Sequence, residues 1–206
     1  MKALLAAPPI TSQGTRERMI MILLYDTAIR VSELLELRIS SLCLHSIPTI
    51  RIHGKGNKDK SVSLSAATIP HLKKYLSLFH PDMNSDSPLF YTRIKGSVAP
   101  MSQGNVARIL NKYAEQIRPD HPDLPEHIHR HMFRRTRATG LYRSGVEMEM
   151  IAVILGHAST ETTRIYATPS LEMMNEVMSN SDPMITEEAT EWEGNEDELA
   201  RLCGLR

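Results

Sequence analysis

The apolar positions of this chain recur mostly at the three- and four-residue spacing of helices. Residues 15–27, TRERMIMILLYDT, have the spacing of a buried helix, and residues 66–79 carry one apolar stripe. Ser32 and Ser102 are suited to cap two further helices, and Gly156 is suited to follow the end of another. The remaining helices are expected at 32–37, 102–117, 131–143, 146–155, 160–166, 171–178 and 196–202.

One segment alternates with the two-residue period of a strand instead. Ile50 and Ile52 alternate with polar residues, as do Val62 and Leu64, and GKGNKD lies between the two runs. Glycine and asparagine between alternating runs predict a β-hairpin. Loops are expected at 82–88 and in the proline-rich stretch 120–125. The predicted fold class is therefore mainly α with a small antiparallel β-sheet (α+β).

Composition places the chain among ordinary globular proteins. Its 206 residues, 41% hydrophobic and 23% charged, suffice for one core with an appendage. No apolar run reaches the roughly 18 residues of a membrane-spanning helix, so no membrane partner is expected. Two cysteines, Cys43 and Cys203, make no disulfide framework, and a reduced, cytoplasmic chain is expected.

Charge divides the chain into two parts. Residues 1–168 carry 22 Lys and Arg against 14 Asp and Glu, whereas residues 169–206 carry 2 against 10. The first part therefore suits a polyanionic partner better than the net charge of zero suggests. We expect a domain over 1–168 and an acidic tail with short helices over 169–206, which is solvated or contacts protein.

Four segments carry candidate chemistry: TAIRVSELLEL with Arg30, HGKGNKDKSVSL with Lys55, HRHMFRRTRATGLYRSG with His131 and Arg134, and LGHASTETTRIYA with His157 and Tyr166. Each alone has an ordinary structural interpretation, such as a surface cation, a turn lysine or a packing tyrosine. Their order and spacing together resemble the tyrosine recombinase (phage integrase) family, over roughly residues 10–168. The resemblance implies the fold of DNA breaking–rejoining enzymes.

The resemblance also implies a role for each residue. Tyr166 would be the nucleophile that forms a 3′-phosphotyrosyl bond, and Lys55 would protonate the departing 5′ oxygen. His131 would act as acid or base toward the tyrosine, and His157 would donate to a non-bridging oxygen. Arg30 and Arg134, the latter three residues after His131, are permanently charged forks that match two phosphate oxygens. They can stabilise the transition state without a metal, and no cofactor is expected.

Three positions depart from the family pattern. Ala28 stands where the family usually has glycine, which is harmless if its φ is negative. Arg135 stands where histidine is frequent, and Ser41 where an acidic residue is frequent. None of the three is assigned a chemical role.

Other interpretations remain open. His127, His129 and His131 alternate and could line one face of a strand as a metal site, with Glu126 nearby. GKGNK resembles part of a phosphate loop but lacks the full pattern, so ATP binding is not expected. A type IB topoisomerase uses similar residues to relax supercoils. A catalytically silent DNA-binding or regulatory module is the alternative from a different class.

The resemblance further implies partners. Double-stranded DNA would be the substrate, bound by a homo-oligomer, a tetramer. Family members usually carry a core-binding domain ahead of the catalytic one, and Arg30 comes so early that this domain is expected to be missing from a fragment of a longer recombinase. Helix 171–178 or the ELARLCGL end is expected to contact the next protomer.

Overall fold

The computed structural model describes residues 1–54, 58–94, 96–129, 131–156 and 161–164. The chain divides into two units, residues 1–168 and 169–206, and the second lies outside the described residues, together with the helices expected there. The helices are α1 (Lys2–Ala6), α2 (Ser12–Asp26), α3 (Val31–Glu36), α4 (Thr68–Phe79), α5 (Gln103–Ile117), α6 (His131–Arg143), α7 (Met148–Leu155) and α8 (Glu161–Arg164), with 3₁₀ turns η1 (Ile39–Ser41) and η2 (Arg118–Asp120).

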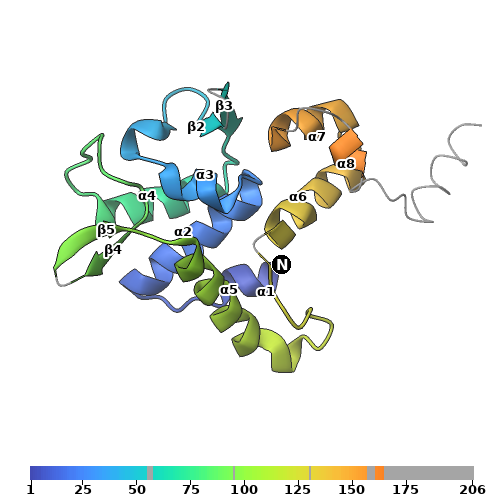
Figure 1. The fold of residues 1–206 in the computed structure, drawn as a ribbon, viewed down its shortest axis with the longest axis horizontal. Helices are drawn as coiled ribbons and strands as arrows, with labels where there is room; N and C mark the ends of the chain where they lie inside the picture. The colour runs from blue at the N-terminus through green and yellow to red at the C-terminus, as the bar shows by residue number, and fades with distance from the viewer. Residues whose placement is uncertain (55–57, 95, 130, 157–160, 165–206) are drawn as a thin grey trace, which may run out of the picture. The chain divides into compact units, whose positions relative to one another are not determined.

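Helix α2 is the centre of the fold (Figure 1). It begins where the Thr11 hydroxyl accepts a hydrogen bond from the backbone N–H of Gly14, three residues before the expected start. It contacts α1, α3, α4, α5 and α6. Its buried residues are distributed around the helix, as expected for a buried helix. The five that expose at most 1% of their surface are Met19, Ile20, Met21, Leu23 and Leu24.

The predicted hairpin is present. Strands β2 (Thr49–Gly54) and β3 (Lys58–Ser63) pair antiparallel, and the short β1 (Leu42–Cys43) adds to the outer edge of β2. A second hairpin, β4 (Tyr91–Ile94) with β5 (Ser97–Pro100), was not predicted. Strand β5 is largely exposed, so neither of its faces needs apolar residues. Its sequence therefore lacks the alternation of apolar and polar residues that would predict a strand.

Two apolar clusters hold the described elements together. The larger one joins α2, the inner face of the β2–β3 hairpin, α4 and α5. The smaller one consists of Ala28, Ala138, Ile151 and Leu155, and it joins the α2–α3 connection to α6 and α7. This smaller cluster lies directly beneath the site described below, because two of its residues present their carbonyl groups there.

The predicted ends of helices were correct in part. Ser102 caps α5 by accepting from the N–H of Asn105, and Gly156 ends α7 in the left-handed conformation, both as expected. Ser32 does not cap α3, because that helix begins one residue earlier at Val31 and its N-cap is Arg30. There the carboxylate of Glu33, the third residue of the helix, accepts from the backbone N–H of Arg30 at 2.8 Å, which is the Glu-to-N-cap bond of a capping box.

No helix in the described part of the chain combines the length and the apolar character that a membrane crossing requires.

Candidate active site

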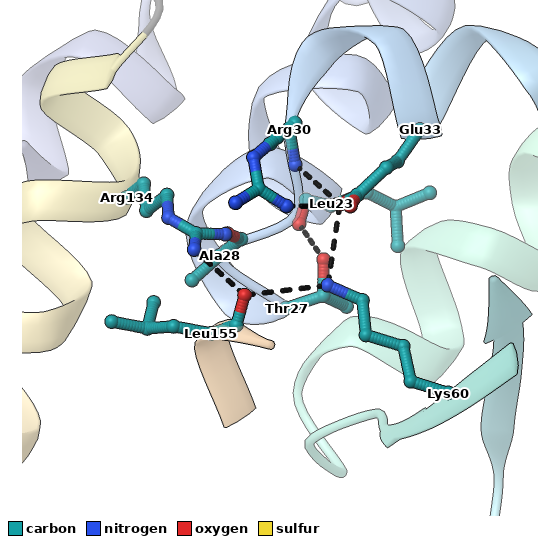
Figure 2. A network of polar contacts seen from close by, with 8 residues as sticks. All are labelled: Leu23, Thr27, Ala28, Arg30, Glu33, Lys60, Arg134 and Leu155. Atoms are coloured by element: carbon teal, nitrogen blue, oxygen red, sulfur yellow. Dashed lines mark hydrogen bonds and ion pairs between the residues drawn. The ribbon is translucent and has the colours of Figure 1, made fainter. Parts of the chain in front are cut away.

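Arg134 is the buried anchor of the site, with only 4% of its surface exposed. Its Nη1 donates to the carbonyl of Ala28 at 2.9 Å, and its Nη2 donates to the carbonyl of Leu155 at 2.6 Å (Figure 2). The first carbonyl belongs to the α2–α3 connection and the second to the last residue of α7. One guanidinium group from α6 therefore joins two segments that are far apart in the sequence, and these bonds orient its plane.

Ala28 turns the chain between α2 and α3 with a left-handed backbone, φ +52°. The negative φ under which alanine would replace the usual glycine without strain is therefore not found, and an L-residue with a Cβ is strained in this region. The methyl group of Ala28 is fully buried against Ala138 and Leu155 while its carbonyl faces Arg134. The chain leaves this turn directly into α3, whose N-cap is Arg30, so Arg30 lies next to the segment that holds Arg134.

Arg30 is more accessible than Arg134, since 44% of its side chain is exposed. Its Nη1 donates to Glu33 Oε1 at 2.9 Å, which fixes the guanidinium over the first turn of α3. Burial alone would raise the pKa of the Glu33 carboxyl. Hydrogen bonds from the backbone and side chain of Arg30, together with the charges of Lys60 and Arg30, instead hold that pKa below its ordinary value. Glu33 therefore remains ionised and keeps Arg30 in place.

Lys60 is a site residue that the sequence analysis missed. Its Nζ donates to Glu33 Oε2 at 3.3 Å and to the carbonyl of Leu155 at 3.4 Å (Figure 2). Burial lowers the pKa of Lys60, and so do the charges of Arg134 and Arg30, while the carboxylate of Glu33 raises it; the net direction is downward. Lys60 shares the carbonyl of Leu155 with Arg134 and the carboxylate of Glu33 with Arg30, so both guanidinium groups lie near this ammonium group.

A signal for Lys60 was present in the alternation of β3. Lys60 pairs with Ile52 and is two residues from Val62, so these three side chains share the inner face of the hairpin. Asp59, on the other face, is exposed. Continuing the alternation from Val62 toward the turn would have predicted an inward-pointing lysine.

Gly156 completes the turn next to Lys60. Its φ of +64° favours glycine, and its N–H bonds back to the carbonyls of Ala152 and Val153. A Cβ at this position would lie 3.0 Å from Lys60 Nζ. Glycine is thus suited to this position both by its backbone conformation and by the close approach of the lysine.

Of the six predicted site residues, the structure describes three. Arg30 and Arg134 are brought to the same turn of chain, and His131 begins α6, exposed, one helical turn before Arg134. Lys55, His157 and Tyr166 lie outside the described residues.

Comparison with known proteins decides the family. The model of the phage integrase family matches residues 1–173. This chain belongs to that family. The resemblance expected from the four segments is thereby confirmed, and the mainly helical fold with small antiparallel sheets is that of tyrosine recombinase catalytic domains, as predicted.

Individual relatives agree with the family assignment. Tyrosine recombinase XerC of Staphylococcus carnosus is 31% identical over 176 residues, which cover 85% of this chain and 57% of the relative. The crystal structure of XerA recombinase is similar, with 27% identity, a TM-score of 0.72 and coverage of 89% of this chain and 62% of that one. XerH site-specific recombinase bound to its difH substrate has 28% identity and a TM-score of 0.64, with 88% and 52% covered. The chain thus spans less than two thirds of the length of these relatives.

The alternative of a metal site required His127, His129 and His131 to lie on one face of a strand. His127 and His129 lie in irregular backbone and His131 lies in a helix, so the three do not line one face of a strand. The rings of His127 and His129 have centroids 6.3 Å apart. Within the described ranges, no three His, Cys, Asp or Glu side chains gather closely enough to hold a metal ion.

The described part of the site suits an anion. Among the described residues, Arg30, Lys60 and Arg134 bring three positive charges to it, and Glu33 brings one carboxylate. Planar guanidinium groups match the spacing of phosphate oxygens, and partial burial strengthens their field. An oxyanion such as a phosphate group therefore fits this arrangement in geometry and charge.

Proposed function

We propose that this chain is the catalytic domain of a site-specific tyrosine recombinase that cleaves and rejoins DNA strands. The observation that carries the proposal is the convergence of Arg30 and Arg134 on the α2–α3 connection, beside the Leu155–Gly156 turn that leads in the sequence to His157. Two oriented guanidinium groups are what phosphoryl transfer requires, since most of its catalysis is charge stabilisation and alignment.

The proposed reaction follows from these groups. The phenolic oxygen of Tyr166 attacks the phosphorus while Arg30 and Arg134 bind its non-bridging oxygens, with His157 as an additional donor. The bond between phosphorus and the 5′ oxygen breaks, and Lys55 gives this oxygen its proton. His131 assists proton transfer at the tyrosine. Because one phosphate ester replaces another, the 5′ hydroxyl of a second strand can reverse the step without ATP or a cofactor.

We propose double-stranded DNA as the partner. Support comes from the excess of Lys and Arg in residues 1–168 and from the similar XerH site-specific recombinase, whose structure is of a complex with its difH substrate. We further propose that the chain acts in the cytoplasm, as a tetramer on DNA and together with a core-binding domain. Of these three proposals, only the last has support from the relatives, because the match covers 57% of the length of the XerC relative. Residues 169–206 are proposed to contact a neighbouring protomer.

The test is covalent trapping on a pool of DNA duplexes. Each duplex carries a nick beside a randomised core, so that cleavage releases a short strand and prevents rejoining. We expect a protein–DNA adduct that resists denaturation, and sequencing of the trapped DNA then gives the preferred site. Tyr166→Phe abolishes the adduct because it removes the attacking oxygen.

Three outcomes would contradict the proposal. An adduct that persists in Tyr166→Phe removes this residue as nucleophile. Relaxation of supercoiled DNA without preference for a site favours a topoisomerase. DNA binding without any adduct, at protein concentrations that saturate the duplex, favours a silent DNA-binding module.

A further inference from the structure

We infer that Lys60 is a positioning residue of the proposed site. Lys60 holds two groups in the arrangement needed for cleavage: Glu33, which is the partner of Arg30, and the Leu155–Gly156 turn. The inference rests on the proposed function. It concerns a lysine five positions after Lys55 in the sequence, with a different proposed task. The contacts of Lys60 with two separate elements carry the inference.

The location of Lys60 is unusual for a lysine. It lies in the middle of β3 on the inner face, beside Ile52, and only 18% of its side chain is exposed. A charged group is rarely placed on such a face unless it is paired, because leaving water is costly. Here the charge is paired with Glu33 Oε2 and with the carbonyl of Leu155, so the ammonium group links the hairpin to α3 and to α7.

The contact with Glu33 affects Arg30. Glu33 Oε1 accepts from Arg30 Nη1, whereas Oε2 accepts from the Arg30 backbone N–H and from Lys60. Lys60 therefore shares the carboxylate with Arg30. Without the lysine, the single negative charge of Glu33 would offset the charge of Arg30 alone, and the site would attract phosphate less strongly.

The contact with Leu155 affects the end of α7. The last carbonyl groups of a helix carry partial negative charge and lack partners within the helix. Lys60 and Arg134 both donate to the carbonyl of Leu155, at 3.4 and 2.6 Å. Since His157 follows Gly156 directly in the sequence, these two donors define where the chain leaves α7 toward that histidine.

A bridging role differs from that of a general acid. A general acid gives its proton to the leaving oxygen, whereas the protons of Lys60 are directed at Glu33 and Leu155. Loss of Lys60 should misplace the groups around the phosphate and slow the chemical step whatever the leaving group is. Loss of Lys55 should slow only the departure of an oxygen that needs a proton.

The experiment measures single-turnover cleavage of the duplex trapped by the wild-type protein, at saturating protein. For Lys60→Met, which keeps the length of the side chain, we expect a rate constant lower by about 10- to 100-fold with an unchanged final amplitude. Lys60→Arg keeps the positive charge and is expected to recover most of the rate. The matched control is Arg51→Met, which removes a cation from the exposed face of the same sheet and should leave the rate unchanged.

A second substrate separates the two lysines. A sulfur atom in place of the bridging 5′ oxygen leaves without protonation, so it should rescue Lys55→Ala and leave Lys60→Met slow. Rescue of Lys60→Met by sulfur would overturn the inference in favour of an acid role. A wild-type rate constant with a reduced amplitude would also overturn it, because this result indicates a smaller folded fraction.

The adduct of the wild-type protein and the cleavage rate of Lys60→Met separate this inference from the recombinase proposal. A wild-type adduct together with normal cleavage by Lys60→Met overturns the inference alone. The absence of any wild-type adduct overturns both. If Lys60→Met does not fold, as judged by circular dichroism, Lys60→Gln replaces it and has the same expected loss of rate.

Discussion

At the scale of single residues, the backbone conformation of Ala28 is the most consequential feature. Its positive φ directs its carbonyl to Arg134 and brings Arg30 to the start of α3. The methyl group is buried, so the strain of the left-handed turn is opposed by packing in the small apolar cluster. The positions of the two guanidinium groups thus depend on a turn in which the backbone of alanine is strained.

We predict that Ala28→Gly changes the free energy of unfolding by less than about 1 kcal/mol. Removing the strain should raise the free energy of unfolding by about 1–2 kcal/mol. Loss of the buried methyl group should lower it by about 0.8 kcal/mol, and the larger conformational entropy of the unfolded glycine variant should lower it by somewhat less than that. The matched control is Ala138→Gly, which removes an equally buried methyl group from the interior of helix α6. Without strain to relieve, it should cost about 1–2 kcal/mol more than Ala28→Gly. Equal losses in urea unfolding would show that Ala28 is unstrained.

At the scale of elements, a buried carboxylate fastens α5 to α2. Glu17 is 3% exposed and accepts from the Tyr113 hydroxyl, from Lys112 Nζ at 3.0 Å and from Gln13 at 2.8 Å. Burial alone would raise the pKa of Glu17, but hydrogen bonds from these three side chains and the charge of Lys112 lower it overall. Its contribution to stability is therefore complete above the ordinary pKa of about 4.3 and is lost as pH falls through the lower, folded value.

We predict that Tyr113→Phe lowers the free energy of unfolding by about 2 kcal/mol near pH 7, because a buried carboxylate loses a hydrogen bond. The loss should shrink as pH falls through the lowered pKa of folded Glu17, where this carboxylate becomes protonated in the wild-type protein as well. Tyr91→Phe is the control, since the Tyr91 hydroxyl donates to the backbone carbonyl of Phe79, which does not titrate. Chemical denaturation across this pH range measures both variants, and a loss for Tyr113→Phe that is independent of pH would contradict the role of Glu17.

At the scale of the whole molecule, charge is divided along the chain. Residues 1–168 have eight more Lys and Arg than Asp and Glu, and residues 169–206 have eight fewer. A polyanion such as DNA is attracted by the first part and repelled by the second. The acidic segment should therefore weaken binding of DNA by the rest of the chain wherever the two are linked.

We predict that deleting residues 169–206 raises the affinity for a short DNA duplex by roughly tenfold or more at low salt, and that the gain diminishes as salt screens the charges. Fluorescence anisotropy of a labelled duplex at several salt concentrations measures this. A full-length variant in which the acidic residues of this segment become amides should reproduce the gain if charge is the cause. Equal affinity of the deleted and intact chains at low salt would exclude such repulsion.

The amino-acid sequence by itself determined the elements whose patterns are local. The bounds of α6 agree with the prediction, as do those of α5 with its Ser102 cap, because amphipathic periodicity and capping act within a few residues. The hairpin with buried Ile50 and Ile52 follows from alternation in the same way. The order of the four chemical segments sufficed to identify the family, since it depends on residue type and spacing alone.

Only the tertiary structure decided how these elements serve the site. No local pattern brings the carbonyls of Ala28 and Leu155 to Arg134, or Lys60 to Glu33, because each contact joins segments that meet only after the chain has turned and packed. The positive φ of Ala28 is likewise set by the buried cluster around it and overrides the preference of alanine. Local propensity acts over a few residues, whereas a constellation of charges around one phosphate is a property of packing.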